Sequence, residues 1–293
     1  MPLEEIPVVW LQGGGCTGCT VSLANSSFPS LRNILLDQIL PGAHLSLIYH
    51  PTLMAGEGED AFEVLSETPG DGFVLAIEGA LPRNEKFCTV GQRDGQEVSV
   101  LAEFTRLARS ASLVLAVGTC SSFGGIPTGS PNPGDYRSAL DILGAEGIGT
   151  PVLNVPGCPP HPDWITTTIG EYLLAGSAAR VATDELNRPL SIYGQVIHEN
   201  CPRRAYYDEG KFAEKPGDPE CLHELGCQGP ITYADCPLRE WNDGTSWCVK
   251  SGGPCNGCTQ PEYIDQVTPL YEELPEKELP KIGAAENTGE TNE

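Results

Sequence analysis

The sequence predicts an α/β fold, a doubly wound parallel sheet followed by a small irregular region rich in cysteine. Three observations lead to this prediction. Five short apolar runs punctuate the first half of the 293-residue chain, and amphipathic stretches lie between them. After about Asp184, cysteine, proline and glycine become dense and periodic segments disappear. This length suffices for one large domain or two modest ones.

Each apolar run is short, rich in β-branched residues and closely followed by glycine or proline. The runs cover residues 7–11, 45–49, 73–77, 113–117 and 151–155. Such runs are typical of strands that are buried on both faces of a parallel sheet. Amphipathic stretches at residues 30–40, 98–111 and 162–174 predict helices. The alternation therefore predicts βαβ units with helices on both faces of the sheet.

We divide the chain into domains where its composition changes. A sheet domain is predicted over residues 1–183 and a cysteine-rich domain over residues 184–271. The second has too little apolar periodicity to fold by burial alone, so metal–ligand bonds are expected to supply much of its stability. Residues 272–293 contain seven Glu and two Lys and are predicted to form an acidic tail.

Composition excludes several classes of function. The chain has 17 basic and 40 acidic residues, a net charge of −23, which disfavours binding to nucleic acid or to an anionic membrane. No run of about 18 apolar residues predicts a membrane span. The first ten residues have no basic segment or long apolar segment of an export signal. We therefore predict a cytoplasmic protein, with a periplasmic or membrane-associated one as the alternative if a leader was removed.

Four of the twelve cysteines follow predicted strands directly. Cys16 and Cys19 come after the first run, Cys120 after the fourth and Cys158 after the fifth. Open α/β sheets place their binding crevice beyond the carboxyl ends of the strands, so these four thiols are predicted to form one metal site. Cys16-x-x-Cys19 alone would also fit zinc or a thioredoxin-type redox pair. A redox pair, however, has no use for Cys120 and Cys158.

The second half contains two further sets of four ligands. The first set is His198, Cys201, Cys221 and Cys227, and the second is Cys236, Cys248, Cys255 and Cys258. Zinc would satisfy either set. Three zinc ions would have no chemical task in one chain, whereas three iron–sulfur clusters in series would conduct electrons. Only Cys88 is left over, and we interpret it as a structural thiol.

Several motifs resemble the small subunit of nickel–iron hydrogenases. In the first half these are Trp10-Leu-Gln-Gly-Gly-Gly-Cys16-Thr-Gly-Cys19-Thr, Val117-Gly-Thr-Cys120 and Val155-Pro-Gly-Cys158-Pro-Pro-His-Pro-Asp-Trp164. In the second half they are His198-Glu-Asn-Cys201-Pro, Glu224-Leu-Gly-Cys227-Gln-Gly-Pro, Tyr233-Ala-Asp-Cys236, Arg239-Glu-Trp-Asn-Asp-Gly244 and Cys255-Asn-Gly-Cys258. The resemblance extends from about residue 6 to about residue 271, nearly the whole chain.

The resemblance implies a flavodoxin-like domain, a cluster domain and three iron–sulfur clusters. The proximal 4Fe–4S cluster would be bound by Cys16, Cys19, Cys120 and Cys158, and the distal 4Fe–4S cluster by His198, Cys201, Cys221 and Cys227. The medial cluster would be bound by Cys236, Cys248, Cys255 and Cys258. Many members have proline at the position of Cys248 and a 3Fe–4S cluster, so cysteine here implies a medial 4Fe–4S cluster, as in nickel–iron–selenium members.

The resemblance also implies how work is divided between subunits. The nickel–iron centre belongs to a separate large subunit, so this chain is expected to contain no catalytic residue. It would carry electrons between that centre and a redox partner at the distal cluster, while the complex interconverts dihydrogen with two protons and two electrons. The large subunit is expected to dock around the proximal cluster, on the loops after the first and fourth apolar runs.

Three positions depart from patterns found in some members. Oxygen-tolerant membrane-bound members have two additional cysteines near the proximal cluster, where this chain has Gly18 and Gly125. The modified cluster of those members is therefore not expected. Many relatives have Glu directly after Cys-Thr-Gly-Cys-Thr, where this chain has Val21, so a proton-relay role of that position is not carried over.

Three other interpretations compete with this one. A quinone-reductase subunit of respiratory complexes shares the first cluster domain but should lack the pattern from His198 to Cys258. A stand-alone ferredoxin-like carrier would purify without a partner chain and without nickel. A zinc-stabilised structural protein would be colourless, whereas iron–sulfur clusters give a brown protein.

Overall fold

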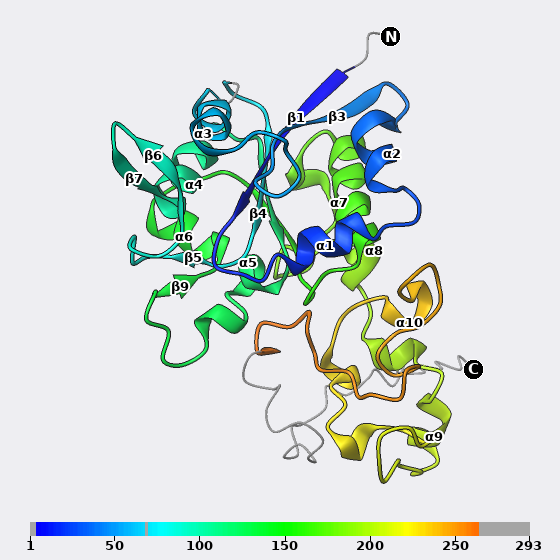
Figure 1. Cartoon of the computed structure of the whole chain (residues 1–293). Coiled ribbons are helices and arrows are strands. Elements are labelled where there is room, and N and C mark those ends of the chain that lie inside the picture. Colours follow the sequence, from blue (N-terminus) through cyan, green and yellow to red (C-terminus); the bar gives the residue numbers. More distant parts are fainter. Residues whose placement is uncertain (1–3, 68–69, 264–293) are drawn as a thin grey trace, which may run out of the picture.

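The computed structural model describes residues 4–67 and 70–263, and a six-stranded sheet forms its centre (Figure 1). The strand order is β10-β8-β4-β1-β3-β2. The bounds are β1 Glu4–Gln12, β2 Gln38–Leu40, β3 Ala43–Tyr49, β4 Val74–Glu78, β8 Leu113–Val117 and β10 Val152–Val155. All neighbours are parallel except β2, which is antiparallel to β3. Counted along the chain, the parallel strands lie in the order 2-1-3-4-5 of flavodoxin-like sheets, which confirms the predicted fold class.

The five predicted strands are all present. Every residue of β4, β8 and β10 is buried, which explains why their sequences are continuously apolar instead of alternating. The sheet separates two apolar clusters. One contains Leu23, Ile34 and Trp164 from helices on one face, and the other contains Phe62 and Phe104 from helices on the opposite face.

Helices cover both faces of the sheet. Their bounds are α1 Gly18–Ala24, α2 Leu31–Leu36, α3 Gly58–Ser66, α4 Val100–Ala108, α5 Thr119–Phe123, α6 Ala139–Ala145 and α7 Pro162–Ala175. The serine hydroxyls of Ser30, Ser99 and Ser138 accept hydrogen bonds from the first turns of α2, α4 and α6, and thereby fix where these helices begin. Short 3₁₀ helices follow α5 and α7 at Ile126–Thr128 and Ala178–Arg180.

Two predicted helices are shorter than expected. The stretch 30–40 forms a helix only as far as Leu36, because Asp37 is extended and residues 38–40 pair with the edge of β3 as β2. Residues 98 and 99 of the stretch 98–111 belong to β7 (Gln96–Ser99), which forms a hairpin with β6 (Thr89–Arg93). A second small pair joins β5 (Leu81–Pro82) to β9 (Tyr136–Arg137).

Residues 184–263, here named the cysteine region, contain only short elements, whereas residues 4–67 and 70–181 form the sheet region. The elements are α8 Leu190–Tyr193, α9 Arg204–Asp208, α10 Cys236–Arg239 and 3₁₀ helices at Ile197–Asn200, His223–Leu225 and Gly229–Ile231. Figure 1 shows most of this region, coloured from yellow-green to orange, beyond the carboxyl ends of the strands. The domain boundary at residues 183 and 184 stays a prediction, and the acidic tail 272–293 lies outside the described residues.

The two regions share one apolar core. Trp164 of α7 is fully buried and lies 5.5 Å from the ring of Tyr193 and 6.1 Å from that of Trp241, measured between ring centroids. The Trp164 indole also donates a 2.6 Å hydrogen bond to Asp235. Buried Leu222 and Trp247 of the cysteine region belong to the same apolar cluster as strand residues of the sheet region. The cysteine region is therefore packed directly on the sheet region.

Candidate functional site

Three loops bring four cysteines together at the carboxyl edge of the sheet. Cys16 lies between β1 and α1, Cys19 lies in the first turn of α1, Cys120 lies in α5 directly after β8, and Cys158 lies after β10. Burial raises the pKa of the Cys19 thiol far above its usual range, and the charges of Glu78 and the other three cysteines raise it further. Burial, followed by the charge of Cys158, raises the pKa of Cys120 to about 12. We call Cys16, Cys19, Cys120 and Cys158 the sheet-edge group.

The backbone conformation of the loop after β8 leaves space for the thiol of Cys19. Gly118 has φ 89°, a conformation that only glycine adopts readily, and a Cβ at this position would lie 2.5 Å from Cys19 Sγ. The next residue, Thr119, accepts a 2.9 Å hydrogen bond from the amide of Gly157 and so ties the loop of Cys120 to the loop of Cys158. The loop after β8 is therefore shaped around the sulfur of a neighbouring loop.

The cysteine region brings together a second set of thiols, Cys201, Cys221 and Cys227. Burial is the main cause that raises the pKa of each, and the charges of Cys201 and Cys221 act on Cys227. His198 is buried nearby. Its ring lies 4.6 Å from the ring of Tyr207, and its backbone nitrogen lies beside the same Gly229 that borders Cys227 Sγ. We call His198, Cys201, Cys221 and Cys227 the outer group.

A third set lies between these two. Burial and then the charges of Cys258 and Cys248 raise the pKa of Cys236. Burial and then the charges of Cys227, Cys258 and Cys236 raise the pKa of Cys255. Within this set Cys255 is buried, whereas Cys248 is exposed. We call Cys236, Cys248, Cys255 and Cys258 the middle group.

Direct contacts fix the order of the three groups. The backbone N–H of Cys255 donates a 3.3 Å hydrogen bond to Cys227 Sγ, which joins the middle group to the outer group. On the other side, the hydroxyl of Thr119 donates to the carbonyl of Cys258. The charge of Cys158 also contributes to the raised pKa of Cys258, after burial. The order is therefore sheet-edge, middle and outer group.

Cys88 lies apart from the three groups. Its sulfur is 3.7 Å from the hydroxyl of Tyr136, on the loop between β5 and β6. This position agrees with the interpretation that Cys88 is a structural thiol. Among the residues that the structure describes, no group of three or more His, Cys, Asp or Glu side chains is arranged to hold a single metal ion.

Sequence reasoning missed a buried carboxylate at the same edge of the sheet. Glu78 is the last residue of β4, and its side chain accepts hydrogen bonds from the backbone N–H groups of Cys19 and Thr20 at 3.0 and 3.1 Å. The sequence feature that could have identified Glu78 is its position, because a Glu at the carboxyl end of a buried strand faces the same crevice as the cysteines.

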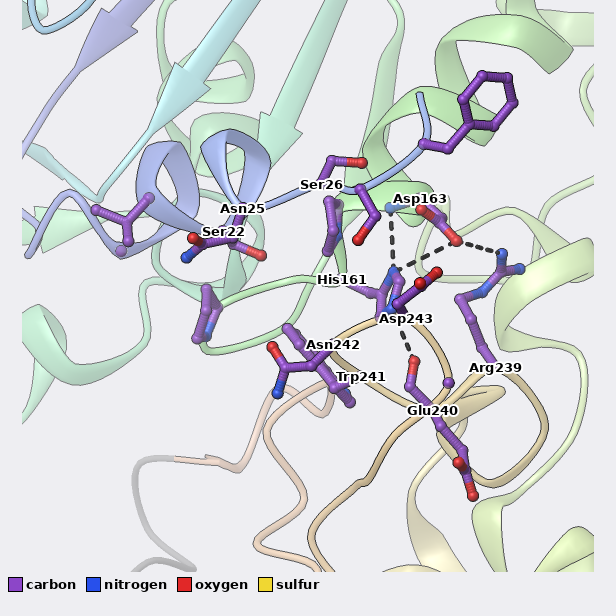
Figure 2. Close-up of a pocket in the computed structure, with 17 residues that line it drawn as sticks. Ser22, Asn25, Ser26, His161, Asp163, Arg239, Glu240, Trp241, Asn242 and Asp243 are labelled. Atoms are coloured by element: carbon purple, nitrogen blue, oxygen red, sulfur yellow. Dashed lines mark hydrogen bonds and ion pairs between the residues drawn. The ribbon is translucent and has the colours of Figure 1, made fainter. Parts of the chain in front are cut away.

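A pocket of about 390 Å³ borders the sheet-edge group. It lies between α1, the start of α7 and the loop at residues 239–244, and Gly18 and Pro159, each adjacent in sequence to a cysteine of the group, line it. Figure 2 shows His161 at its centre, where Nδ1 accepts a 3.1 Å hydrogen bond from the Asp163 amide and Nε2 lies 2.8 Å from the Glu240 carbonyl. Arg239 reaches Asp163 at 3.3 Å across the boundary between the two regions.

Two family models match the chain, one in each region. The model of the 20 Kd subunit of NADH ubiquinone oxidoreductase matches residues 16–172, and the model of the C-terminal part of the NiFe/NiFeSe hydrogenase small subunit matches residues 193–271. The periplasmic [NiFeSe] hydrogenase small subunit of Desulfomicrobium baculatum is 42% identical, with 92% of this chain and 87% of that protein covered. The chain belongs to the family of nickel–iron hydrogenase small subunits.

Other members of the hydrogenase family support the same assignment. The periplasmic [NiFe] hydrogenase small subunit 1 of Nitratidesulfovibrio vulgaris is 36% identical, over 90% of this chain and 81% of that one. The solved [NiFeSe] hydrogenase from Desulfovibrio vulgaris Hildenborough superposes with a TM-score of 0.86 at 42% identity, over 92% of this chain and 98% of that chain. The match at residues 193–271 rejects the interpretation that the chain is a respiratory quinone-reductase subunit.

Family membership confirms the predicted function in outline. The chain is the electron-transfer subunit of a hydrogenase, an oxidoreductase whose partner is a large subunit, and it binds iron–sulfur clusters. The cytoplasmic location finds no support, because two of the relatives are named periplasmic. Within residues 4–67 and 70–263, no helix is long and apolar enough to cross a membrane.

The donor chemistry of the three groups fits iron–sulfur clusters. Burial, and then the charges of neighbouring groups, raise the pKa of Cys19, Cys120, Cys236 and Cys255, and a bound metal ion would replace the proton of such a thiol. In the sheet-edge group, the missing side chain at Gly118 leaves free the space beside Cys19 Sγ. The residues present therefore suit clusters held by thiolates.

Proposed function

We propose that this hydrogenase chain holds three 4Fe–4S clusters in series, which connect the large subunit to an external redox partner. Cys16, Cys19, Cys120 and Cys158 would hold the proximal cluster, and Cys236, Cys248, Cys255 and Cys258 the medial one. His198, Cys201, Cys221 and Cys227 would hold the distal cluster. When bound, each cluster takes up and releases one electron.

The observation that carries this proposal is the order of the three groups. Cys255 of the middle group donates its backbone N–H to Cys227 of the outer group, and Cys258 is linked through Thr119 to the loops of the sheet-edge group. These contacts join the three ligand sets, and Cys221, Cys255 and His198 among them are buried. Burial of this kind lets the protein set the potential of a cluster.

The cluster type of the middle group is a separate part of the proposal. Cys248 contributes to the raised pKa values of Cys236 and Cys258, which supports a fourth thiolate ligand there. Iron and sulfide analysis is expected to give about twelve of each per chain, as three cubanes require. About eleven irons with a 3Fe EPR signal in the isolated protein would contradict the assignment of the medial cluster.

The direct test of electron transfer through the three clusters is Cys16→Ala in the purified two-subunit complex. This variant should lose the proximal cluster and hydrogen oxidation with a dye acceptor, while the large subunit still matures with its nickel. Cys88→Ala is the matched control, because Cys88 lies outside the three groups, and it should keep full iron content and activity. Full dye-linked activity of Cys16→Ala would reject electron transfer through this series of clusters.

The large subunit is proposed to dock around the sheet-edge group. Cys16 is exposed there, and Val21 and Ile126, which follow Cys19 and Cys120, are each 55% exposed although apolar. Exposed apolar side chains around a functional group are typical of an obligate interface, which buries roughly 2,000 Å² or more. Val21→Asp should weaken co-purification of the large subunit, whereas Leu174→Asp, at an exposed site on α7, should not. Equal yields of complex from both variants would contradict this surface.

Two finer assignments follow from relatives. The name of the Desulfomicrobium baculatum relative supports a selenium-containing type of large subunit, which selenium analysis of the complex would test. The names of two relatives also support a periplasmic location. Cell fractionation with periplasmic and cytoplasmic marker enzymes decides the compartment, and recovery with the cytoplasmic marker would reject the periplasm.

A further inference from the structure

Glu78 lies beside the sheet-edge group and is hydrogen-bonded through both of its carboxylate oxygens. Its side chain is 3% exposed and accepts five hydrogen bonds. Oε1 accepts from the backbone N–H groups of Cys19 at 3.0 Å and Thr20 at 3.1 Å. Oε2 accepts from Trp10 Nε1 at 3.1 Å, from Gln12 Nε2 at 3.2 Å and from the Thr20 hydroxyl.

The surrounding donors define the charge of this side chain. His50 Nδ1 accepts from the amides of Thr52 and Leu53, so Nε2 carries the ring proton and donates to the Thr20 hydroxyl. Gln12 Nε2 also donates to that hydroxyl at 3.1 Å. Both acceptor positions of Thr20 Oγ1 are therefore occupied, and its own proton goes to Glu78 Oε2. Every partner of Glu78 is a donor, so the carboxylate is ionised.

His50 belongs to the same network and is neutral. Burial lowers the pKa of His50 to about 4, against a smaller opposite effect of Glu78. Its ring stacks on Trp10 with 5.1 Å between ring centroids. The negative charge of Glu78 is therefore stabilised by dipoles and not by a buried cation.

The topology places this charge where it acts on the sheet-edge group. β1 and β4 are adjacent, and the strand order reverses between them, which is where open α/β sheets bind their ligands. Cys16 and Cys19 follow the carboxyl end of β1, and Glu78 is the last residue of β4. The charge of Glu78 also contributes to the raised pKa values of Cys19 and Cys120.

We propose that Glu78 is a positioning residue that lowers the reduction potential of the cluster held by the sheet-edge group. Its carboxylate keeps the amides of Cys19 and Thr20 directed toward itself, so neither amide donates to a sulfur, and it fixes a negative charge beside the site. Fewer N–H···S hydrogen bonds and more negative charge both disfavour the reduced cluster. The proposal rests on the proposed function of this group as the proximal cluster site.

The test uses Glu78→Gln in the complex with its large subunit. Glutamine keeps the volume and still offers an oxygen to the two backbone amides, but it removes the charge. An EPR-monitored redox titration should show a proximal potential that is higher than in the wild type. We expect an approximately tenfold change in the reduction equilibrium, about 59 mV for one electron. The proximal signal is identified by its loss in Cys16→Ala.

Trp10→Phe tests the sign of the effect. It removes one donor from Oε2 and keeps an aromatic ring beside His50, so the carboxylate is less neutralised and the proximal potential should fall. Glu103→Gln is the matched control, because Glu103 is also a buried carboxylate, and it lies in α4 with Arg106 as its partner. Loss of that charge should leave the proximal potential unchanged. A purely structural role of Glu78 would not produce shifts of opposite sign.

The outcomes separate this proposal from the proposed function. Opposite shifts in Glu78→Gln and Trp10→Phe, with none in Glu103→Gln, support it. An unchanged potential in Glu78→Gln, or shifts of the same sign in both variants, overturns it. If Glu78→Gln does not assemble, the Trp10→Phe titration decides alone, and no shift overturns the proposal. A wild-type complex without the signal that Cys16→Ala removes would instead reject the proposed function.

Discussion

The sheet region and the cysteine region both present groups of thiols, but they hold them in different ways. In the sheet region, Cys120 and Cys158 follow strands whose every residue is buried. In the cysteine region, Cys201 and Cys221 lie among turns and helices of only three to five residues. Burial of apolar side chains therefore positions the first group, whereas we expect the other two groups to depend on bonds to their proposed clusters.

The largest expected difference appears when the clusters are absent. In the chain prepared without clusters, backbone amides of the cysteine region should lose at least about 1,000-fold of their protection against hydrogen exchange, or roughly 4 kcal/mol. The amides of β4 and β8 should keep most of theirs, because the buried sheet does not depend on metal. Hydrogen exchange measured by mass spectrometry, with the loaded chain as control, compares the two regions. Equal loss of protection in both would mean that metal also holds the sheet.

Arg188 connects the two ends of the cysteine region by direct hydrogen bonds. Its buried guanidinium donates to Asp184 at 2.7 Å and to the carbonyl of Thr259 at 2.9 Å. Arg188→Met leaves Asp184 without its cationic partner and should cost about 3 kcal/mol of stability.

Thermal unfolding of the complex measures this cost. Arg109→Met is the matched control, because Arg109 is exposed and its distance to Glu146 is 3.9 Å, and it should cost less than about 0.5 kcal/mol. If both variants unfold at the same temperature, the contacts of Arg188 with Asp184 and Thr259 do not stabilise the cysteine region.

The sequence predicts the sheet region better than the cysteine region, for a physical reason. A strand buried on both faces needs a continuous apolar run, so each of the five strands can be recognised locally. The cysteine region has no such period, and only its ligands stand out. Residues 38–40 look helical in their own segment, but pairing with the distant edge of β3 makes them a strand. Local patterns do not contain that contact.

The candidate site follows the same rule. Cysteines after strand ends are visible in the sequence because their type and position agree. Glu78 is a single acidic residue, and the partners that define it, Trp10 and Thr20, precede it by 68 and 58 residues. The position of Glu78 at the end of an apolar run marks the residue, but only the sheet order brings these partners together, so no spacing in the sequence indicates the network.

Gly118 shapes the loop after β8, inside the sheet region. Alanine at this position would adopt an unfavourable positive φ and place its Cβ 2.5 Å from Cys19 Sγ. Gly118→Ala should therefore lower the free energy of unfolding by about 2 kcal/mol. It should also lower the iron content by about four atoms per chain, the iron of one cluster. Gly144→Ala in α6 is the control, because a Cβ there meets no atom within 4 Å, and it should be neutral or stabilising. Full iron content in Gly118→Ala would show that the loop after β8 can move away from the sulfur.

The smallest expected effect concerns His50, a polar group that the sheet region buries without a metal. Its pKa is lowered to about 4 by burial, from about 6.5 in the unfolded chain. Well above pH 6.5 the ring is neutral in both states and has no effect on pH dependence. As the pH falls below 6.5, only the unfolded chain binds the proton, so the folded state loses stability until about pH 4.

Between pH 7.5 and pH 5.5 this loss should be about 1 kcal/mol. His50→Asn keeps an acceptor for the amides of Thr52 and Leu53 but does not titrate, so its melting temperature should fall less than that of the wild type over this range. Thermal unfolding of both complexes at the two pH values measures the difference. Parallel decreases would mean that His50 gains its proton in the folded chain as readily as in the unfolded one, and that the network around Glu78 tolerates a second charge.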